Sequence, residues 1–387
     1  MNLFIVPSWY PSGSNPSYGI FVKEQIAMMA NERPSWKIGV STWGQGDESK
    51  LIWVKDHLNN LKKIVNHGSD IAKTVDSNGF KEYYQPALSW TKKFKKGNIR
   101  EIIRSNELNY QVFALENGKP DLIMVQACYP GVLIADYLSE KYKIPTHLHI
   151  RLGGKMFENM LSELGQMRTK MLSAISRANL ITVTSKFHQV EINKWVAKSS
   201  ILYNPVDRDF FKIDKSLKGD YAVAIGRLED EKGFDRLIDA LVLVPDLNLK
   251  IVGKGSLERK LIRKVEKFNL SSRVNFYGES NRTDVRRFIQ NSKFLILPSS
   301  YETFGNVILE AMACGKPVVA TKCGGPQEIV NADIGYLAEM DTEDLAQKIQ
   351  LMVDSLNQFD TDQIRKDSER FSSQAWINSL EKLIITL

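Results

Sequence analysis

Short apolar runs alternate with longer amphipathic stretches along the whole chain, and this alternation most restricts the fold. Five runs lie in the first half, at residues 3–6, 38–42, 122–125, 146–150 and 180–183. Five more lie in the second half, at residues 221–225, 249–252, 274–277, 294–297 and 317–320. Such runs, separated by helical patterns, are typical of buried parallel strands joined by crossover helices. The sequence therefore predicts an α/β fold built on parallel sheets.

The length of the chain and a turn near its middle indicate how it divides. At 387 residues the chain is too long for one ordinary hydrophobic core and suggests two domains. The turn-forming segment Asn204-Pro205-Val206-Asp207 interrupts the alternation and is a natural hinge. We expect an N-terminal domain over residues 1–205 and a C-terminal domain over residues 206–366. The amphipathic segment 367–387 is expected to form a final helix.

Two glutamates stand eight positions apart in the segment 301–310, directly after one of the apolar runs. A helix is expected over residues 307–314. Gly305 lets the backbone pass close to a ligand, and the first N–H groups of the helix can face an anion. Residues eight apart on one straight helix diverge by about 80°. We therefore expect Glu302 on the loop and Glu310 on the helix, meeting different parts of one ligand.

This segment resembles the Glu-x7-Glu signature of the retaining, nucleotide-sugar-dependent glycosyltransferases of family four. The resemblance extends over nearly the whole chain and includes the segments Pro7–Pro11, Gly19–Phe21, Arg177–Ile181, Gly226–Gly233, Ala311–Pro317 and Gly324–Glu328. It implies the GT-B architecture, in which two Rossmann-like domains face each other across a cleft. It also implies that the final helix crosses back to the first domain.

The resemblance assigns roles to both glutamates. It implies that Glu310 binds the ribose hydroxyls of the nucleotide and that Glu302 approaches the transferred sugar. The intervening backbone helps to hold both parts of the donor. The implied substrate contacts of this segment are Phe304, Gly305, Asn306, Val307 and Glu310.

Two cations follow the first predicted strand of the second half. A diphosphate leaving group gains negative charge as its bond to the sugar breaks, and fixed cations or a metal must stabilise that charge. Arg227 offers a planar fork for two phosphate oxygens, and Lys232 offers a mobile point charge. The resemblance implies that both act on the donor diphosphate as catalytic residues. The alternative is that they are surface cations balancing the acidic run 229–231.

Three further residues are implied to bind the donor. Gly253 and Lys254 end the next predicted strand, and the resemblance places this loop beside the nucleotide. Gly19 opens a predicted helix in the first domain, and its amide is implied to help hold the diphosphate.

The segment 145–154 contains the candidates for a group near the transferred sugar, where the family often carries a histidine. Both His149 and Arg151 fit this role, and the sequence leaves the choice open. Strand alternation places His147, His149 and Arg151 on one face. The remaining histidines are expected at the surface: His57, His67 and His188.

The resemblance implies that neither a cofactor nor an obligatory metal is needed and that a nucleotide-diphosphate sugar is the co-substrate. The chain lacks a Gly-x-Gly-x-x-Gly motif after its first strand and lacks a Gly-Lys-Ser/Thr phosphate loop, which argues against a dehydrogenase or a nucleoside triphosphatase. The triplets at 207–209 and 360–362 have Asp-x-Asp spacing but are interpreted as structural. The three cysteines do not have metal or disulfide spacing.

The excess positive charge is concentrated in the window 50–104. This window holds twelve Lys or Arg residues and five Asp or Glu residues, so its excess equals the net charge of +7 of the whole chain. With its interspersed aromatic residues it suits the anionic lipid of an inner membrane leaflet. A solvated basic face is the alternative, and no nucleic-acid-binding motif accompanies the charge. Without a run of about 18 apolar residues or a secretory signal, we expect a cytoplasmic protein that contacts the membrane peripherally.

The expected function is therefore transfer of a hexose, with retention, from a nucleotide-diphosphate sugar to a hydroxyl acceptor. A UDP-sugar is favoured as donor and GDP-mannose is the alternative. The acceptor is expected to be a glycan or lipid-linked glycan in surface polysaccharide or oligosaccharide assembly. A nucleotide-sugar epimerase of the same fold and a non-catalytic binder of polyanions or nucleotide sugars are the competing hypotheses.

Overall fold

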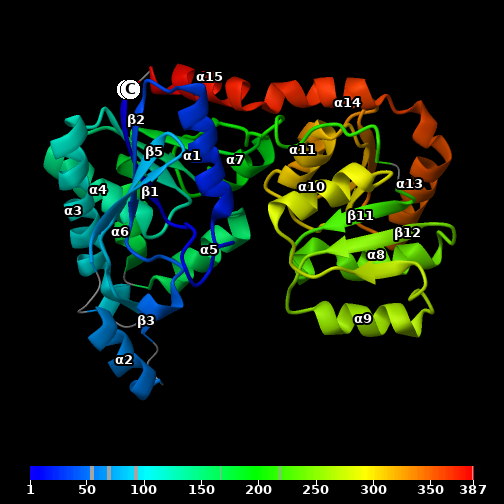
Figure 1. The fold of residues 1–387 in the computed structure, drawn as a ribbon, viewed down its shortest axis with the longest axis horizontal. Helices are drawn as coiled ribbons and strands as arrows, with labels where there is room; N and C mark the ends of the chain where they lie inside the picture. Colours follow the sequence, from blue (N-terminus) through cyan, green and yellow to red (C-terminus); the bar gives the residue numbers. More distant parts are fainter. Residues whose placement is uncertain (53–55, 68–70, 91–94, 166, 218, 386) are drawn as a thin grey trace. The chain divides into compact units, whose positions relative to one another are not determined.

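The computed structural model describes residues 1–387 except 53–55, 68–70, 91–94, 166, 218 and 386 (Figure 1). The chain divides into two compact units. Unit 1 comprises Met1–Thr184, His188–Leu202 and Ile377–Leu387. Unit 2 comprises Ser185–Phe187 and Tyr203–Trp376. Each unit is an α/β fold around a largely parallel sheet, which confirms the predicted fold class of two Rossmann-like domains.

An eight-stranded sheet forms the centre of unit 1, in the order β10-β9-β8-β7-β1-β2-β5-β4. Its strands are β1 (Asn2–Pro7), β2 (Lys37–Thr42), β4 (Lys73–Ser77), β5 (Phe80–Tyr84), β7 (Leu122–Gln126), β8 (Thr146–His149), β9 (Leu180–Val183) and β10 (Ser200–Ile201). All neighbours pair in parallel except β4 and β5, which pair antiparallel. The short strands β3 (Leu51–Ile52) and β6 (Ser89–Trp90) pair separately.

Helices cover the central strands of this sheet. They are α1 (Ile20–Glu32), α3 (Ile99–Asn117), α4 (Gly131–Tyr142), α5 (Gly154–Glu163), α6 (Met167–Arg177) and α7 (Lys186–Ile192), with the short helices η1 (Glu48–Lys50) and η2 (Lys95–Asn98) in connections. β7 is buried along its whole length, because both faces of a parallel sheet are packed. A further helix, α2 (His57–His67), contacts η1.

A six-stranded parallel sheet forms the centre of unit 2, in the order β13-β12-β11-β14-β15-β16. Its strands are β11 (Tyr221–Ile225), β12 (Asn248–Val252), β13 (Val274–Phe276), β14 (Leu295–Leu297), β15 (Val318–Thr321) and β16 (Gly335–Ala338). Alternate residues of β11 enter two different cores. Ala222 and Ala224 pack with Leu237 of α8, whereas Val223 packs with Ile308 and Leu309 of α11.

The helices of unit 2 follow its strands. They are η3 (Asp230–Lys232), α8 (Phe234–Val242), α9 (Glu258–Lys267), α10 (Arg282–Asn291), α11 (Asn306–Ala313), α12 (Pro326–Ile329), α13 (Thr342–Ser355), η4 (Leu356–Gln358), α14 (Thr361–Asp367) and η5 (Ser368–Phe371). The predicted helix at 307–314 is therefore present one residue earlier, and Gly315 follows it with a φ of +69°.

Two segments belong to a different unit from the residues that precede them in the sequence. The last helix, α15 (Ser373–Ile384), carries Glu381, which forms an ion pair of 2.6 Å with Arg33 within unit 1. Residues 185–187 belong to unit 2, where Glu328 accepts the backbone N–H groups of Lys186 and Phe187 at 3.0 and 2.9 Å. The chain therefore enters unit 2 briefly before it completes unit 1.

Every apolar run used to predict a strand forms one, within one residue at each end. The prediction missed the hairpin of β4 and β5, the edge strands β10 and β16, and the pair β3–β6. β4 is exposed over most of its length, so its sequence carries no apolar run. Within the described residues, no helix is long and apolar enough to cross a bilayer.

Candidate functional site

The loops at the carboxyl ends of the unit 2 strands pack against one another through their backbones. The amide of Gly253, after β12, donates to the carbonyl of Gly278, after β13, at 2.8 Å. The amide of Leu228, after β11, donates to the carbonyl of Lys254 at 3.0 Å. These bonds fix the relative positions of the loops that carry the predicted donor-binding residues.

Two glycines permit these close approaches. Gly253 has a φ of +143°, and a Cβ there would lie 1.9 Å from the carbonyl oxygen of Gly226. Gly233, with a φ of +65°, would place a Cβ 2.0 Å from the carbonyl oxygen of Pro298. No side chain fits at either distance, so glycine is required for the loops to meet. Glycine at position 253 therefore lets the loop after β12 approach the Gly226 backbone closely.

Lys232 and Glu302 form a half-buried ion pair at this edge of the sheet. The Lys232 ammonium lies 2.6 Å from the Glu302 carboxylate, and their side chains are 21% and 13% exposed. The Ser299 hydroxyl donates to the same carboxylate oxygen at 2.9 Å. Because the loop after β14 is held against the loop after β11, two residues 70 positions apart meet here. The pair presents one fixed positive and one fixed negative group side by side.

Arg227 lies closer to solvent. Its guanidinium contacts Glu231 at 2.8 Å, and the arginine side chain is 65% exposed. Arg227 and Lys232 therefore pair with different carboxylates, Glu231 and Glu302. Lys254 is exposed, and its backbone carbonyl accepts from Leu228. A long exposed cation can reorient at little cost toward a bound anion.

Glu310 lies on α11, as predicted, while Glu302 lies on the preceding loop. The Glu310 side chain is 18% exposed and lies 3.4 Å from the Arg282 guanidinium. Arg282 in turn lies over the ring of Phe211, 4.9 Å from its centroid. Burial raises the pKa of Glu310 to about 7, and the nearby Arg282 charge only partly opposes this rise.

This pKa makes the stability of the protein depend on pH. The folded-state pKa of Glu310 lies above its ordinary value, so the folded state binds more protons than the unfolded state at mild acidity. The free energy of unfolding is therefore expected to fall as pH rises from about 4.5 to about 7, by up to about 3 kcal/mol. Glu310→Gln should remove this contribution in urea unfolding measured across that range. The exposed Glu266→Gln is the matched control, and an unchanged slope in Glu310→Gln would contradict the assignment.

The residues between the two glutamates have mixed surroundings. The Phe304 ring is buried and stacks on Tyr203, with ring centroids 5.3 Å apart. Its predicted substrate contact would therefore involve its backbone. Gly305 caps α11 with a φ of +100°. The Asn306 side chain accepts from Asn204 at 2.8 Å, and Val307 is half-buried.

The predicted residues of unit 1 lie at the ends of its strands and at the start of α1. Gly19 caps α1 with a φ of +68°, and a Cβ there would lie 2.5 Å from the Trp9 backbone. His147 and His149, on β8, both contact the Thr182 hydroxyl at 2.7 Å and so share a face, as predicted. Burial lowers the pKa of His147 to about 3.

Arg151 lies beyond the end of β8 and has other partners. Its Nε donates to Gln126 at 3.1 Å, and its guanidinium also donates to Gln25 of α1. The guanidinium lies over the Phe21 ring, 5.1 Å from its centroid. His149 and Arg151 thus have different surroundings in unit 1, and both remain candidates for the sugar-binding role.

The prediction that His188 lies at the surface was wrong. This residue is fully buried, and its Nε2 contacts the Leu152 carbonyl at 2.8 Å. Its Nδ1 accepts from the Thr184 amide at 3.3 Å. Burial lowers its pKa to about 4. The residues before His188 include the polar pair Thr184-Ser185 and form no apolar run. The sequence therefore does not indicate that this histidine is buried. His67 is half-buried, and the side chain of His57 lies outside the described part of the chain.

Sequence reasoning missed two residues of this site. Ser299 is fully buried and donates to Glu302, and Arg282 pairs with Glu310. Ser299 had one available signal, since it follows directly after a predicted buried strand and the Pro298 that ends it. Arg282 had none, because its contact joins α10 to α11.

Comparison with known proteins gives matches to the C-terminal half and to most of the chain. The family model for glycosyl transferases group 1 matches residues 205–370, which include all the candidate residues of unit 2. A Methanocaldococcus jannaschii protein described as an uncharacterized glycosyltransferase is 31% identical over 301 residues, covering 76% of this chain and 82% of that protein. The chain belongs to the group 1 glycosyltransferases.

Other known proteins resemble the chain in sequence or in fold. The N-acetyl-alpha-D-glucosaminyl L-malate synthase of Bacillus anthracis is 30% identical over 289 residues, covering 68% of this chain and 74% of that enzyme. Sucrose-phosphate synthase from Thermosynechococcus elongatus has a TM-score of 0.74 at 18% identity, covering 100% of this chain and 98% of that one. Anabaena HepE in complex with UDP-glucose has a TM-score of 0.69 at 18% identity, with full coverage of both chains.

Proposed function

We propose that this glycosyltransferase moves a hexose from a nucleotide-diphosphate sugar to a hydroxyl acceptor with retention of configuration. The observation that carries the proposal is the Lys232–Glu302 ion pair, which lies at the strand edge that also presents Glu310. A fixed ammonium beside a carboxylate suits a ligand with a charged leaving group and a hydroxyl-rich sugar. The carboxylate of Glu310 suits the ribose hydroxyls, which donate hydrogen bonds.

The proposed chemistry needs no dedicated base. The bond between the sugar's anomeric carbon and the diphosphate oxygen breaks, and the acceptor oxygen bonds to that carbon on the same face. The acceptor proton passes to the departing phosphate oxygen. Arg227 and Lys232 stabilise the negative charge that develops on the diphosphate. Glu302 orients Lys232 and accepts from the sugar hydroxyls.

We favour UDP-sugars as donors, with GDP-mannose as the alternative. Support comes from the full-length fold similarity to HepE, which was crystallised with UDP-glucose. The backbones of Gly253, Lys254 and the 304–307 segment provide the donor contacts. Gly19 acts on the diphosphate, and His149 or Arg151 acts on the transferred sugar. Because fixed cations neutralise the diphosphate, transfer is proposed to proceed without an obligatory metal.

The Asp-x-Asp triplets have a structural role that is compatible with this proposal. Asp207 accepts from the amides of residues 209 and 210 at 3.1 and 2.9 Å. Asp360 accepts from the amides of residues 362 and 363 at 2.8 and 3.2 Å and caps α14. These carboxylates therefore satisfy backbone donors at turns.

The proposed acceptor is a glycan or lipid-linked glycan at the inner face of the cytoplasmic membrane. Similarity to the lipopolysaccharide core biosynthesis glycosyltransferase LpsE of Rhizobium meliloti, which is 33% identical over 147 residues and 38% of this chain, supports this setting. The basic window 50–104 also supports it. Residues 53–55, 68–70 and 91–94 of the window lie outside the described residues, and Lys50 is buried. Exposed cations of the window include Lys62, Lys73, Arg100 and Arg104. We propose that this part of unit 1 contacts anionic lipid.

The donor is tested by thermal shift and hydrolysis. UDP and UDP-sugars are expected to raise the melting temperature, and GDP and GDP-mannose to raise it less. Glu310→Ala should weaken UDP binding about 10- to 100-fold, because a charge-assisted hydrogen bond contributes about 1.5–3 kcal/mol. Slow hydrolysis of the bound sugar nucleotide should continue after removal of divalent metals with EDTA.

The donor test has a control variant and two outcomes that would contradict the proposal. Glu266→Ala, an exposed glutamate on α9, should leave UDP binding unchanged. Conversion of the donor to another free sugar nucleotide would favour an epimerase over transfer. Equal UDP affinity in Glu310→Ala and the parent would remove the ribose-binding role.

A further inference from the structure

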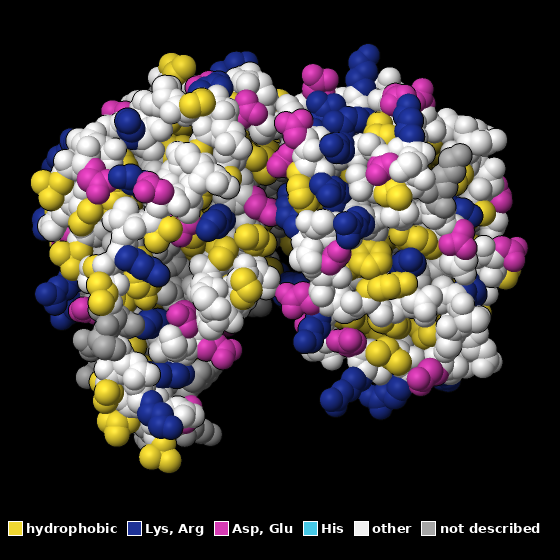
Figure 2. Space-filling model, in the orientation of Figure 1, with side chains coloured by type: hydrophobic (Ala, Val, Ile, Leu, Met, Phe, Trp, Pro, Cys, Tyr) yellow, Lys and Arg dark blue, Asp and Glu magenta, His cyan; other side chains and the backbone are white. Residues whose placement is uncertain are grey.

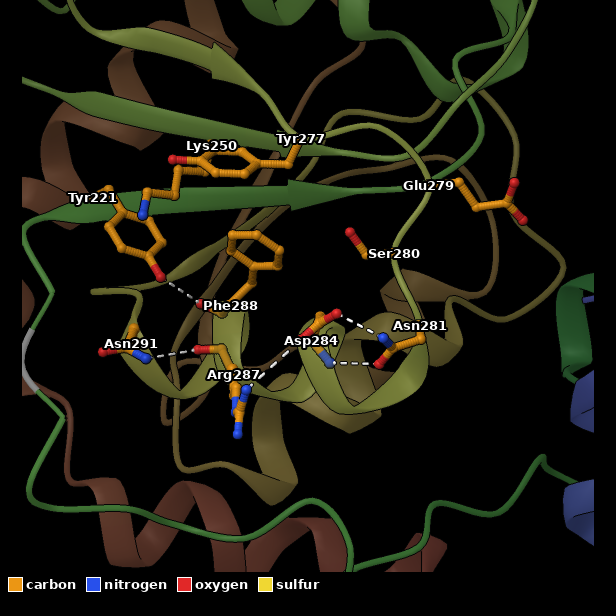
Figure 3. Close-up of a pocket in the computed structure, with 10 residues that line it drawn as sticks. All are labelled: Tyr221, Lys250, Tyr277, Glu279, Ser280, Asn281, Asp284, Arg287, Phe288 and Asn291. Atoms are coloured by element: carbon orange, nitrogen blue, oxygen red, sulfur yellow. Dashed lines mark hydrogen bonds and ion pairs between the residues drawn. The ribbon is translucent and has the colours of Figure 1, made fainter.

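The apolar face of α2 points into solvent. Four side chains form it, with large exposed fractions: Leu58 82%, Leu61 63%, Ile64 50% and Val65 67%. Their spacing places all four on one stripe of the helix. Figure 1 shows α2 beside β3, beyond the ends of the sheet strands of unit 1, and Figure 2 shows apolar atoms gathered on that projection.

The opposite face of α2 is polar, and it is the less exposed one. Asn60, Lys63 and His67 are each half-buried, and the Lys63 ammonium donates to the Leu51 carbonyl at 2.8 Å. A surface helix of a globular protein ordinarily turns its apolar stripe toward the core. In α2 the polar face lies toward the protein and the apolar stripe lies outward. Such an exposed stripe marks a surface that another phase or molecule covers.

The size and shape of this stripe favour a bilayer over a protein partner. A helix of eleven residues is about 16 Å long and is convex. A stable protein interface buries about 800 Å² on each partner and uses about 20–30 residues. The four side chains of one isolated helix do not supply that area. An interfacial helix needs only an apolar stripe that enters the acyl boundary by about 5–10 Å.

The charge around the stripe indicates which lipid is preferred. α2 contains two lysines and no acidic residue. Lys62 is exposed and borders the stripe, where its ammonium can reach headgroups while its stem stays in apolar surroundings. The window 50–104 carries an excess of +7, equal to that of the whole chain. Positive charge of this density attracts anionic lipids.

We infer that α2 lies in the interface of an anionic bilayer, with Leu58, Leu61, Ile64 and Val65 in the acyl boundary. The inference rests on the proposed lipid contact of the basic window and assigns its apolar anchor. The cations attract unit 1 to the surface, and the stripe holds it there. Unit 1, to which the inference also assigns acceptor binding, is then anchored where a lipid-linked glycan is presented.

Cosedimentation with vesicles tests this assignment. The full-length protein is mixed with vesicles of phosphatidylglycerol and phosphatidylcholine, and with vesicles of phosphatidylcholine alone. Binding is expected only to the anionic vesicles. The variant L58Q/L61Q/I64Q/V65Q should lower the partition onto them at least about tenfold, since four aliphatic side chains lose their apolar burial. The matched control is L115Q/V190Q, at positions 87% and 69% exposed elsewhere in unit 1, and it should bind as the parent does.

The other outcomes separate this inference from the proposals on which it depends. If the parent binds anionic vesicles and the α2 variant binds equally well, the anchor is overturned while the basic-window contact stands. If the variant K62E/K73E then lost this binding, charge alone would account for the attachment to anionic vesicles. If the parent binds no anionic vesicle, both are overturned. Concentration-dependent dimerisation that the α2 variant abolishes would assign the stripe to a second copy and overturn the anchor. If the α2 variant keeps the UDP thermal shift, its unit 2 is intact. A loss of vesicle binding is then independent of donor binding.

Discussion

Lys232→Ala is expected to lower kcat by about 10²–10³-fold and to change the donor Kd far less. The ammonium is aimed at charge that grows only as the bond to the diphosphate breaks, so its removal raises the barrier more than it weakens the ground state. The structure adds a second effect, because the variant leaves Glu302 without its cation at 2.6 Å. Single-turnover rates give the chemical step, and UDP-sugar titration gives the affinity.

A matched lysine makes this result specific. Lys264, on α9, has a side chain 16% exposed and pairs with Asp239 at 2.7 Å, so it resembles Lys232 in burial and pairing. Lys264→Ala should keep kcat within a few-fold of the parent, per mole of folded protein. Equal losses in the two variants would mean that the Lys232 effect is structural. An unchanged kcat in Lys232→Ala would remove the leaving-group role.

Gly253→Ala is expected to destabilise unit 2 by about 3 kcal/mol and to abolish most of the activity. The new Cβ would lie 1.9 Å from the Gly226 carbonyl oxygen, and the φ of +143° is unfavourable for alanine. Backbone strain and overpacking each contribute about 1–3 kcal/mol. The displaced loop carries Arg227, so kcat should fall with stability. Hydrogen exchange of peptides from β11 and β12 measures the local stability.

The control for this glycine is Gly278. It also has a positive φ, +67°, but a Cβ there would meet no heavy atom within 4 Å. Gly278→Ala should therefore cost only the conformational strain, about 1 kcal/mol. If the β11 and β12 peptides exchange amide hydrogens equally fast in both alanine variants, the steric contact at Gly253 does not determine the local stability.

The strands and the order of elements were predictable because each buried strand needs a continuous apolar run. The runs at 122–125 and 180–183 became β7 and β9 with little change. Strands without such runs were not predictable. β4 is exposed and depends on pairing with β5, which is a contact between backbones rather than a pattern of side chains.

The candidate site was predictable in its residue types and only partly in its contacts. The spacing of Glu302 and Glu310 correctly separated a loop carboxylate from a helix carboxylate. It did not indicate that Lys232 meets Glu302, because that ion pair depends on the adjacency of β11 and β14 in the sheet. The pairing of Arg282 with Glu310 depends likewise on how α10 packs against α11 on either side of β14 in the chain.

The excursion of residues 185–187 affects how the C-terminal half can be produced as an isolated protein. Within unit 2, Glu328 accepts two amides from this tripeptide, and the Ser185 hydroxyl donates to the Thr303 carbonyl at 2.6 Å. A gene fragment that begins at Tyr203 would omit these donors and leave a carboxylate and a carbonyl beside the Glu302 loop to be hydrated. An isolated unit 2 would therefore have to include residues 185–187. They could be joined to Tyr203 by a linker or included in a circularly permuted chain.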